Sequence, residues 1–280
     1  MIRVITYLFL VLFFNQVRAQ STRETGRTDS SQNGSLVFQR FIPGDYQQVN
    51  VDVLDNIYLI TAGNQLKKLR PDGDSMAVYN EVKKYGNPSL LDVTNPLKIL
   101  LYYKNYATVV ILDRFLSQRN VINFRKQNIF SVKAIATSYD NQIWIFDEQD
   151  YKLKKINEEG AVLLESSDLR QLTGEAPSPE LIIDAENFVY IYDPEKGFFI
   201  FDYYGALKSQ LPFLHWTDIA VAKNQILGFS ENQLHRYTLK SLNLKNFDLS
   251  PLTKDRISLS AMNNKLYLLK KGGLEIYAVQ

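Results

Sequence analysis

The side chains in this sequence that could do chemistry are few and of restricted types. The 280 residues include two histidines, His215 and His235, and no cysteine. The lack of cysteine excludes disulfides, thiolate metal sites, thiol nucleophiles and a lipid-modified N-terminal cysteine. His235 lies in a strand-like segment, where a packed imidazole is expected. His215 lies in the loop-like segment 213–218 and is the better candidate for a functional role.

Carboxylates are the other candidates, because a hard divalent cation prefers Asp, Glu and Asn oxygens. Asp52, Asp92 and Asp184 lie in or near segments with strand patterns. Similar polar residues recur along the chain, however, so the structural interpretation is preferred and neither a metal nor another cofactor is predicted. No Gly-x-Ser-x-Gly elbow, His-Glu-x-x-His pair, sialidase-type Asp box or phosphate loop is present.

A repeat must position these residues. An asparagine opens an apolar-alternating segment six times, with spacings of 39, 46, 46, 37 and 40 residues. The six are Asn56, Asn95, Asn141, Asn187, Asn224 and Asn264. Asn and Asp tolerate the positive φ of a type I′ hairpin turn. Each is therefore predicted to form a tight turn between the innermost strand of a sheet and the next strand.

The segments after these asparagines alternate with period two and are rich in β-branched and aromatic residues, as in residues 142–146 and 188–192. Twisted four-stranded sheets at this period pack radially. Residues 36–280 are therefore predicted to form one all-β domain, a six-bladed β-propeller of four-stranded antiparallel blades. The final repeat supplies only about three strands, so residues 36–41 are predicted to close the ring.

Residues 51–73, which include Val-Asp-Val-Leu-Asp-Asn-Ile-Tyr-Leu-Ile, resemble one repeat of the NHL-type six-bladed propellers. Residues 134–160 and 182–205 show the same pattern. The resemblance implies the architecture and leaves the function open, because such propellers serve as enzymes, ligand binders and protein-docking platforms.

The N-terminus predicts export. Arg3, the apolar run 4–14 and the small residues Val17 and Ala19 have the layout of a signal peptide cleaved after Ala19, and no membrane span is predicted in the mature chain. Residues 20–35 contain no large apolar side chain and are predicted to be a disordered linker. Removing Arg3 and Arg18 leaves 30 basic and 30 acidic residues. The zero net charge disfavours nucleic acid as a partner.

The start of the chain resembles exported proteins of the Bacteroidota, which predicts a periplasmic or outer-membrane-associated location. Loops that enter the innermost strands should open on one rim, where aromatic side chains could anchor a partner. The predicted partner-binding rim consists of Tyr46, Tyr85, Phe130, His215 and Trp216. In the alternative, these residues fold back onto their own blades.

The leading functional hypothesis is a non-enzymatic protein-binding or scaffolding propeller of the bacterial cell envelope, either a monomer or a subunit of an envelope complex. One alternative is a metal-assisted hydrolase similar to lactonase-type propellers, with Asp52, Asp92 and Asp184 in a central tunnel. A glycan-binding propeller is the third hypothesis.

Overall fold

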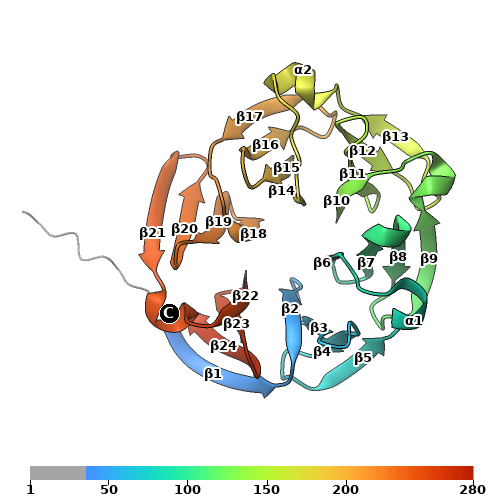
Figure 1. The fold of residues 1–280 in the computed structure, drawn as a ribbon. Coiled ribbons are helices and arrows are strands. Elements are labelled where there is room, and N and C mark those ends of the chain that lie inside the picture. Colours follow the sequence, from blue (N-terminus) through green and yellow to red (C-terminus); the bar gives the residue numbers. More distant parts are fainter. Residues whose placement is uncertain (1–35, 280) are drawn as a thin grey trace, which may run out of the picture. The chain divides into compact units, whose positions relative to one another are not determined.

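The computed structural model describes residues 36–279, which form six four-stranded antiparallel sheets arranged in a ring (Figure 1). This arrangement confirms the six-bladed β-propeller predicted from the repeat. Residues 1–35 and Gln280 lie outside the described residues, so the signal peptide over 1–19 and the linker over 20–35 stay predictions. The described part of the chain holds no helix with the length and apolar character needed to cross a membrane.

The first five blades each use four consecutive strands. Blades 1 to 3 consist of β2 (Tyr46–Val51), β3 (Ile57–Thr61), β4 (Leu66–Leu69), β5 (Ser75–Tyr79), β6 (Leu90–Asn95), β7 (Lys98–Tyr103), β8 (Thr108–Leu112), β9 (Gln118–Asn123), β10 (Val132–Thr137), β11 (Ile143–Asp147), β12 (Lys152–Ile156) and β13 (Val162–Glu165). Blades 4 and 5 consist of β14 (Leu181–Ala185), β15 (Phe188–Asp193), β16 (Gly197–Phe201), β17 (Leu207–Leu211), β18 (Thr217–Ala222), β19 (Gln225–Ser230), β20 (Gln233–Thr238) and β21 (Asn243–Asp248).

Blade 6 joins the two ends of the described chain. It consists of β22 (Arg256–Met262), β23 (Lys265–Lys270), β24 (Gly273–Val279) and β1 (Leu36–Pro43). Strand β1 pairs antiparallel with β24, from Leu36 opposite Val279 to Pro43 opposite Gly273. The predicted closure by the N-terminal strand is confirmed, and it covers a sheet edge that would otherwise be open for aggregation.

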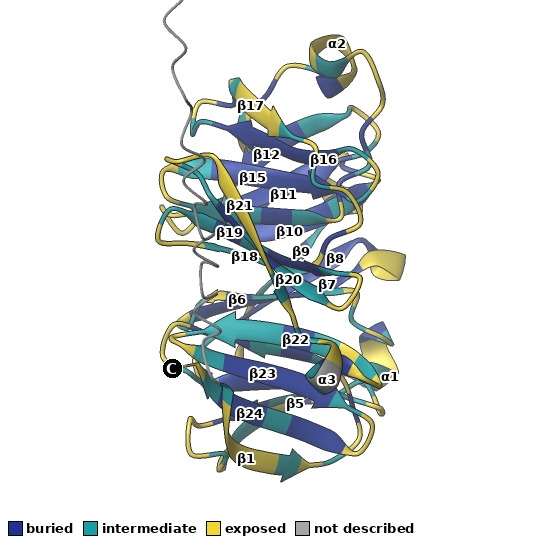
Figure 2. Cartoon of the chain, turned by 90° about the vertical axis from the view of Figure 1, so that its left-hand side faces the viewer, coloured by how far each residue is buried: buried dark blue, intermediate teal, exposed yellow. Residues whose placement is uncertain are grey.

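Apolar side chains fill the spaces between blades. Six buried clusters lie one at each interface between neighbouring blades. Every residue of β7, β8, β11 and β16 is buried, as the dark strands of Figure 2 illustrate for β11. Both faces of these sheets therefore contribute to the core, which explains why their sequences are apolar at nearly every position.

The turns after the innermost strands differ between the two halves of the ring. In blades 4 to 6 they are the two-residue turns Glu186-Asn187, Lys223-Asn224 and Asn263-Asn264, and all six residues have positive φ, as a type I′ turn requires. Blades 1 and 3 instead have five-residue connections, 52–56 and 138–142, and blade 2 turns through Pro96 and Leu97. The predicted tight-turn chemistry is thus present in half of the blades.

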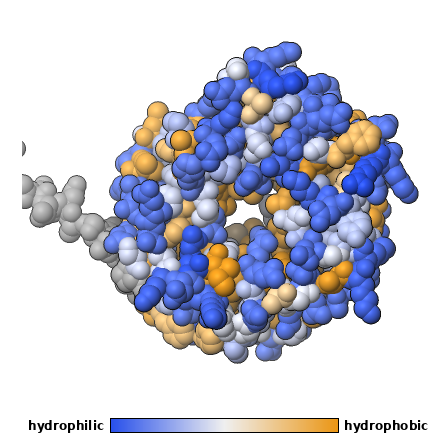
Figure 3. Space-filling model, viewed as in Figure 1, coloured by the Kyte–Doolittle hydropathy of each residue, from blue (hydrophilic) through white to orange (hydrophobic). Residues whose placement is uncertain are grey.

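The ring has two faces, which we name by their connections. The loop face carries the segments that lead from one blade to the next. Its short helices are α1 (Val82–Tyr85), η2 (Phe124–Gln127), α2 (Leu169–Thr173) and α3 (Ser250–Thr253), and η1 (Lys104–Tyr106) joins β7 to β8 on the same face. The turn face is opposite and carries the turns after each innermost strand and after each third strand. Figure 3 shows that the loop face is mostly hydrophilic, with separate hydrophobic patches, some of them beside the central opening.

Candidate functional site

The structure separates the five residues predicted to form the partner-binding rim. Phe130 is 55% exposed, and the side chain of His215 is 65% exposed. Tyr46, Tyr85 and Trp216 are buried. The Tyr46 hydroxyl donates to the Pro43 carbonyl at 3.1 Å, and the Tyr85 ring lies 4.9 Å from the Tyr103 ring. The rings of these three residues therefore pack within the propeller, and only Phe130 and His215 offer side chains to a partner.

Trp216 is buried because the neighbouring strands leave a slot for its indole. The ring stacks between Phe213, at 4.5 Å between centroids, and His235, at 5.0 Å. A Cβ atom added at Gly228 would lie 2.3 Å from the indole, so only glycine fits beneath it. The Trp216 amide donates to the Tyr192 hydroxyl at 2.6 Å, and burial raises the pKa of Tyr192 to about 12. The glycine inside a strand pattern was the one sequence signal for this close approach.

His235 belongs to a polar chain across blade 5. Its Nε2 lies 2.7 Å from the Ser230 hydroxyl, and its Nδ1 lies 2.9 Å from the Asn246 Oδ1. An amide oxygen can only accept, so Nδ1 carries the proton and Nε2 accepts from Ser230. A hydroxyl, an imidazole and an acceptor oxygen are joined in the same order in the catalytic triads of acyl-transfer enzymes. The imidazole is buried beneath Trp216, however, and the three residues join three adjacent strands. We interpret the chain as the hydrogen bonding that a buried imidazole requires.

The three candidate metal-binding carboxylates are engaged in structural hydrogen bonds. Asp52 accepts from the Tyr58 hydroxyl at 3.0 Å and from two amides of its own turn. Asp92 accepts from the Thr137 amide of the next blade at 2.5 Å. Asp184 accepts from the indole N–H of Trp144 at 2.9 Å and from the Tyr203 hydroxyl at 2.7 Å. Within residues 36–279, no three His, Asp or Glu side chains lie close enough together to hold a metal ion.

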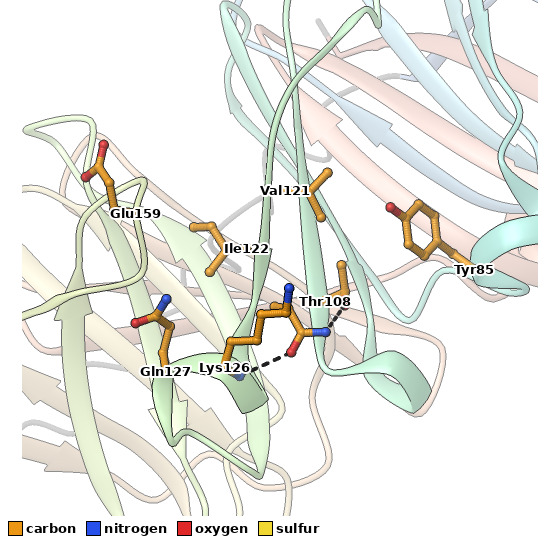
Figure 4. Close-up of a pocket in the computed structure, with 8 residues that line it drawn as sticks. Tyr85, Thr108, Val121, Ile122, Lys126, Gln127 and Glu159 are labelled. Atoms are coloured by element: carbon orange, nitrogen blue, oxygen red, sulfur yellow. Dashed lines mark hydrogen bonds between the residues drawn. The ribbon is translucent and has the colours of Figure 1, made fainter.

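Clefts on the described part of the chain include two that bring polar side chains together. One, of about 390 Å³, lies beside the outer strands of blade 2 and is bordered by Glu159 of blade 3 (Figure 4). In it, Asn123 donates to the Thr108 hydroxyl at 3.4 Å and accepts from the Lys126 amide at 3.3 Å. Its remaining lining residues are Tyr85, Val121, Ile122 and Gln127. The lining offers one carboxylate and one ammonium group and no acid–base pair joined by a hydrogen bond.

The second cleft, of about 370 Å³, brings His215 together with Ser230 and Arg256 on the loop face. The guanidinium of Arg256 forms an ion pair with Asp218 and lies 4.0 Å from the centre of the Phe229 ring. The Nδ1 of His215 lies 3.5 Å from a Glu195 carboxylate oxygen. Arg256 and His215 therefore already face acidic side chains of this chain, and the other charged residue of the lining is Glu231.

Many of the most exposed apolar side chains lie on the turn face, where none were predicted. Seven of them, each between 52% and 84% exposed, lie in turns of blades 1 to 5. They are Val53, Leu54, Leu97, Phe115, Tyr139, Tyr204 and Leu242. The sequence carried a usable signal, because apolar residues in turns are not needed for the strand pattern.

Comparison with solved structures agrees with the fold at low sequence identity. Virginiamycin B lyase from Staphylococcus aureus, in a structure with quinupristin, is 12% identical with a TM-score of 0.59, over 88% of this chain and 89% of that chain. A chain of the mitotic checkpoint complex is 10% identical with a TM-score of 0.57, over 97% of this chain and 99% of that chain. BamB from Moraxella catarrhalis is 11% identical with a TM-score of 0.51, over 87% of this chain and 100% of that chain.

No protein-family model matches the sequence, and no curated protein matches it significantly. The comparisons therefore establish the propeller fold, and the NHL-type resemblance stays a prediction. The similar structures include a lyase and a subunit of a protein complex. Because one fold hosts both kinds of function, the function must be argued from the surface of this chain.

Proposed function

We propose that this protein is a non-enzymatic scaffold of the bacterial cell envelope that binds a protein or peptide partner. The observation that carries the proposal is the location of its exposed apolar side chains. Many of them project from turns and loops on the faces of the ring, others lie on strands, and of all of them only Leu214 lines one of the two clefts described above. Small ligands are held in concave, mostly apolar pockets, whereas proteins bind to broader surfaces. The distribution therefore favours a macromolecular partner.

The environment of the polar groups supports the same proposal. Asp52, Asp92 and Asp184 use their oxygens to hold turns and blades together, and Ser230, His235 and Asn246 bond to one another across one blade. These groups stabilise the ring, and a rigid ring presents its surface residues with little loss of conformational entropy on binding.

Phe130 and His215 are the exposed members of the predicted rim and form the proposed contact on the loop face. Phe130 follows η2 in the connection from blade 2 to blade 3. His215 precedes β18 in the connection from blade 4 to blade 5. The proposed export places the partner in the periplasm or at the outer membrane. The propeller of the mitotic checkpoint complex is an example of this fold in a protein assembly.

Affinity isolation from the native envelope tests the proposal. We expect the mature protein to recover at least one partner in near-stoichiometric amount, and an excess of untagged protein to displace it. A variant with Phe130→Ser and His215→Ala should retain its melting temperature and recover less partner if the loop face contributes. Recovery of no competable partner, together with turnover of a small-molecule substrate by the purified protein, would contradict the scaffold function.

A further inference from the structure

Four exposed apolar residues lie in the first turns of three successive blades on the turn face. Val53 and Leu54 lie in the first turn of blade 1, Leu97 in that of blade 2 and Tyr139 in that of blade 3. We name these four residues the apolar crescent. The equivalent turns of blades 4 to 6 are short and polar, so the crescent is a property of blades 1 to 3 and not of the repeat.

The backbone beneath the crescent is fixed by hydrogen bonds within and between blades. The Leu54 amide donates to Asp52 at 2.9 Å, and the Leu97 amide donates to Asn95 at 2.9 Å. The Tyr139 amide donates to Asp184 of blade 4 at 3.1 Å. These exposed apolar side chains are therefore held on a fixed backbone, and the ring of Tyr139 also lies 4.8 Å from the Lys155 ammonium of its own blade.

Contacts between blades hold the crescent in one arrangement. Asn263 of blade 6 donates to the Val53 carbonyl at 3.0 Å, and Asn95 of blade 2 donates to Asn141 of blade 3 at 2.8 Å. The Tyr139 ring stacks on Tyr203 of blade 4 at 4.1 Å between centroids. A partner would meet a surface that is already ordered, which lowers the entropic cost of binding.

Acidic side chains outnumber basic ones in the exposed turns of the blades that carry the crescent and of blade 4. In the turns of blades 1 to 4 on this face, the exposed charged residues are five acids and two bases. They are Asp72, Asp74, Asp140, Glu159 and Glu186, with Arg70 and Arg114. Asp140 already forms an ion pair with Lys155 at 2.9 Å, so the other four acids are the ones that face a partner. An acidic border repels the anionic headgroups of a membrane surface and attracts basic groups, which favours a basic polypeptide over lipid as the occupant.

We infer that the apolar crescent docks a polypeptide segment of a partner protein in which large apolar side chains are flanked by Lys or Arg. The inference rests on the proposed function and adds the face of the ring and the chemistry of the partner. Apolar side chains of the segment would contact Leu54, Leu97 and Tyr139, and its basic groups would face the acidic border. The site is distinct from the Phe130 and His215 contact on the opposite face.

Photo-crosslinking in the native envelope tests the inference with the full chain. A photoreactive phenylalanine analogue is placed at Leu97 and, in a separate protein, at Phe130, and the crosslinked peptides are sequenced. The inference predicts a crosslink from position 97 to a segment rich in apolar residues with adjacent Lys or Arg. Crosslinking from position 130 alone would overturn the inference and leave the proposed function intact, whereas no protein crosslink from either position would count against both.

Binding of a synthetic peptide copied from the crosslinked segment provides the quantitative arm. Leu97→Ser should raise the dissociation constant by about tenfold or more, as for a central contact residue. The matched variant Leu242→Ser, in a turn of blade 5 outside the crescent, should leave it unchanged, and both proteins should melt at the wild-type temperature because both side chains are exposed. Added salt should weaken binding. Equal affinity of Leu97→Ser and wild type, or a crosslinked segment that is acidic, would overturn the inference.

Discussion

At the scale of single residues, Trp216 shows how a side chain beside an exposed loop residue can belong to the core. Its indole fills the space over Gly228, between Phe213 and His235. Trp216→Ala should lower the free energy of unfolding by about 3 to 5 kcal/mol, the usual cost of truncating a buried aromatic ring. Denaturant unfolding measures this.

His215→Ala provides the adjacent control for that prediction. The side chain is exposed, so the substitution should change the free energy of unfolding by no more than about 0.5 kcal/mol. If Trp216→Ala were as stable as His215→Ala, the indole would not be a packing group, and its place in the partner-binding rim would regain support.

Asp184 provides a second test at this scale, because it bonds to residues of blades 3 and 4. Asp184→Ala would leave the buried Trp144 indole N–H without its acceptor, which should cost about 1 to 3 kcal/mol. Glu186→Ala, two residues later and exposed, is the matched control and should be neutral. Unchanged stability of Asp184→Ala in thermal unfolding would argue against the structural role and in favour of a tunnel metal site.

At the scale of elements, ring closure depends on β1. A chain that begins at residue 36 should melt at the temperature of the mature protein, because it keeps every strand. A chain that begins at residue 44 lacks β1 and exposes the edge of β24, so it should unfold at lower temperature or aggregate. Calorimetry and light scattering distinguish the two, and equal melting of both chains would mean that β1 does not close the ring.

The elements also show what the sequence could predict. Blade number, strand order and closure follow from the spacing of the asparagines and from the missing fourth strand of the last repeat. The exposure of the rim residues was harder to predict from the sequence. Burial of Trp216 depends on Gly228 in another strand, and burial of Tyr85 depends on Tyr103. The sequence does place the apolar residues Val53, Leu54 and Leu97 of the apolar crescent in predicted turns. An interpretation based on the repeat treats all turns as equivalent, however, and therefore predicts the binding surface on the other face.

At the scale of the whole molecule, buried tyrosines link stability to alkaline pH. Burial raises the pKa of Tyr102, Tyr190, Tyr192 and Tyr277 from an ordinary value near 10 to about 12. Because these hydroxyls lose their protons more readily in the unfolded chain than in the folded one, each buried tyrosine stabilises the fold fully below pH 10. This stabilisation is lost as pH rises towards 12 and above. The free energy of unfolding should therefore decline over this window.

Tyrosinate absorbance recorded alongside unfolding checks that prediction. The buried phenols should ionise only as the ring unfolds. Ionisation of all tyrosines near pH 10 with the ring intact would show that their hydroxyls are open to solvent.

The central claim is that a rigid ring binds a macromolecule through its surface. Hydrogen–deuterium exchange of the protein, free and in the complex isolated from the envelope, tests this claim most directly. We predict slower exchange on binding in residues 52–56, 95–98 and 138–142 of the turn face and around Phe130 and His215 of the loop face, with the central strands of the blades unchanged. Identical exchange in both samples, or protection confined to the inner strands around the tunnel, would contradict it.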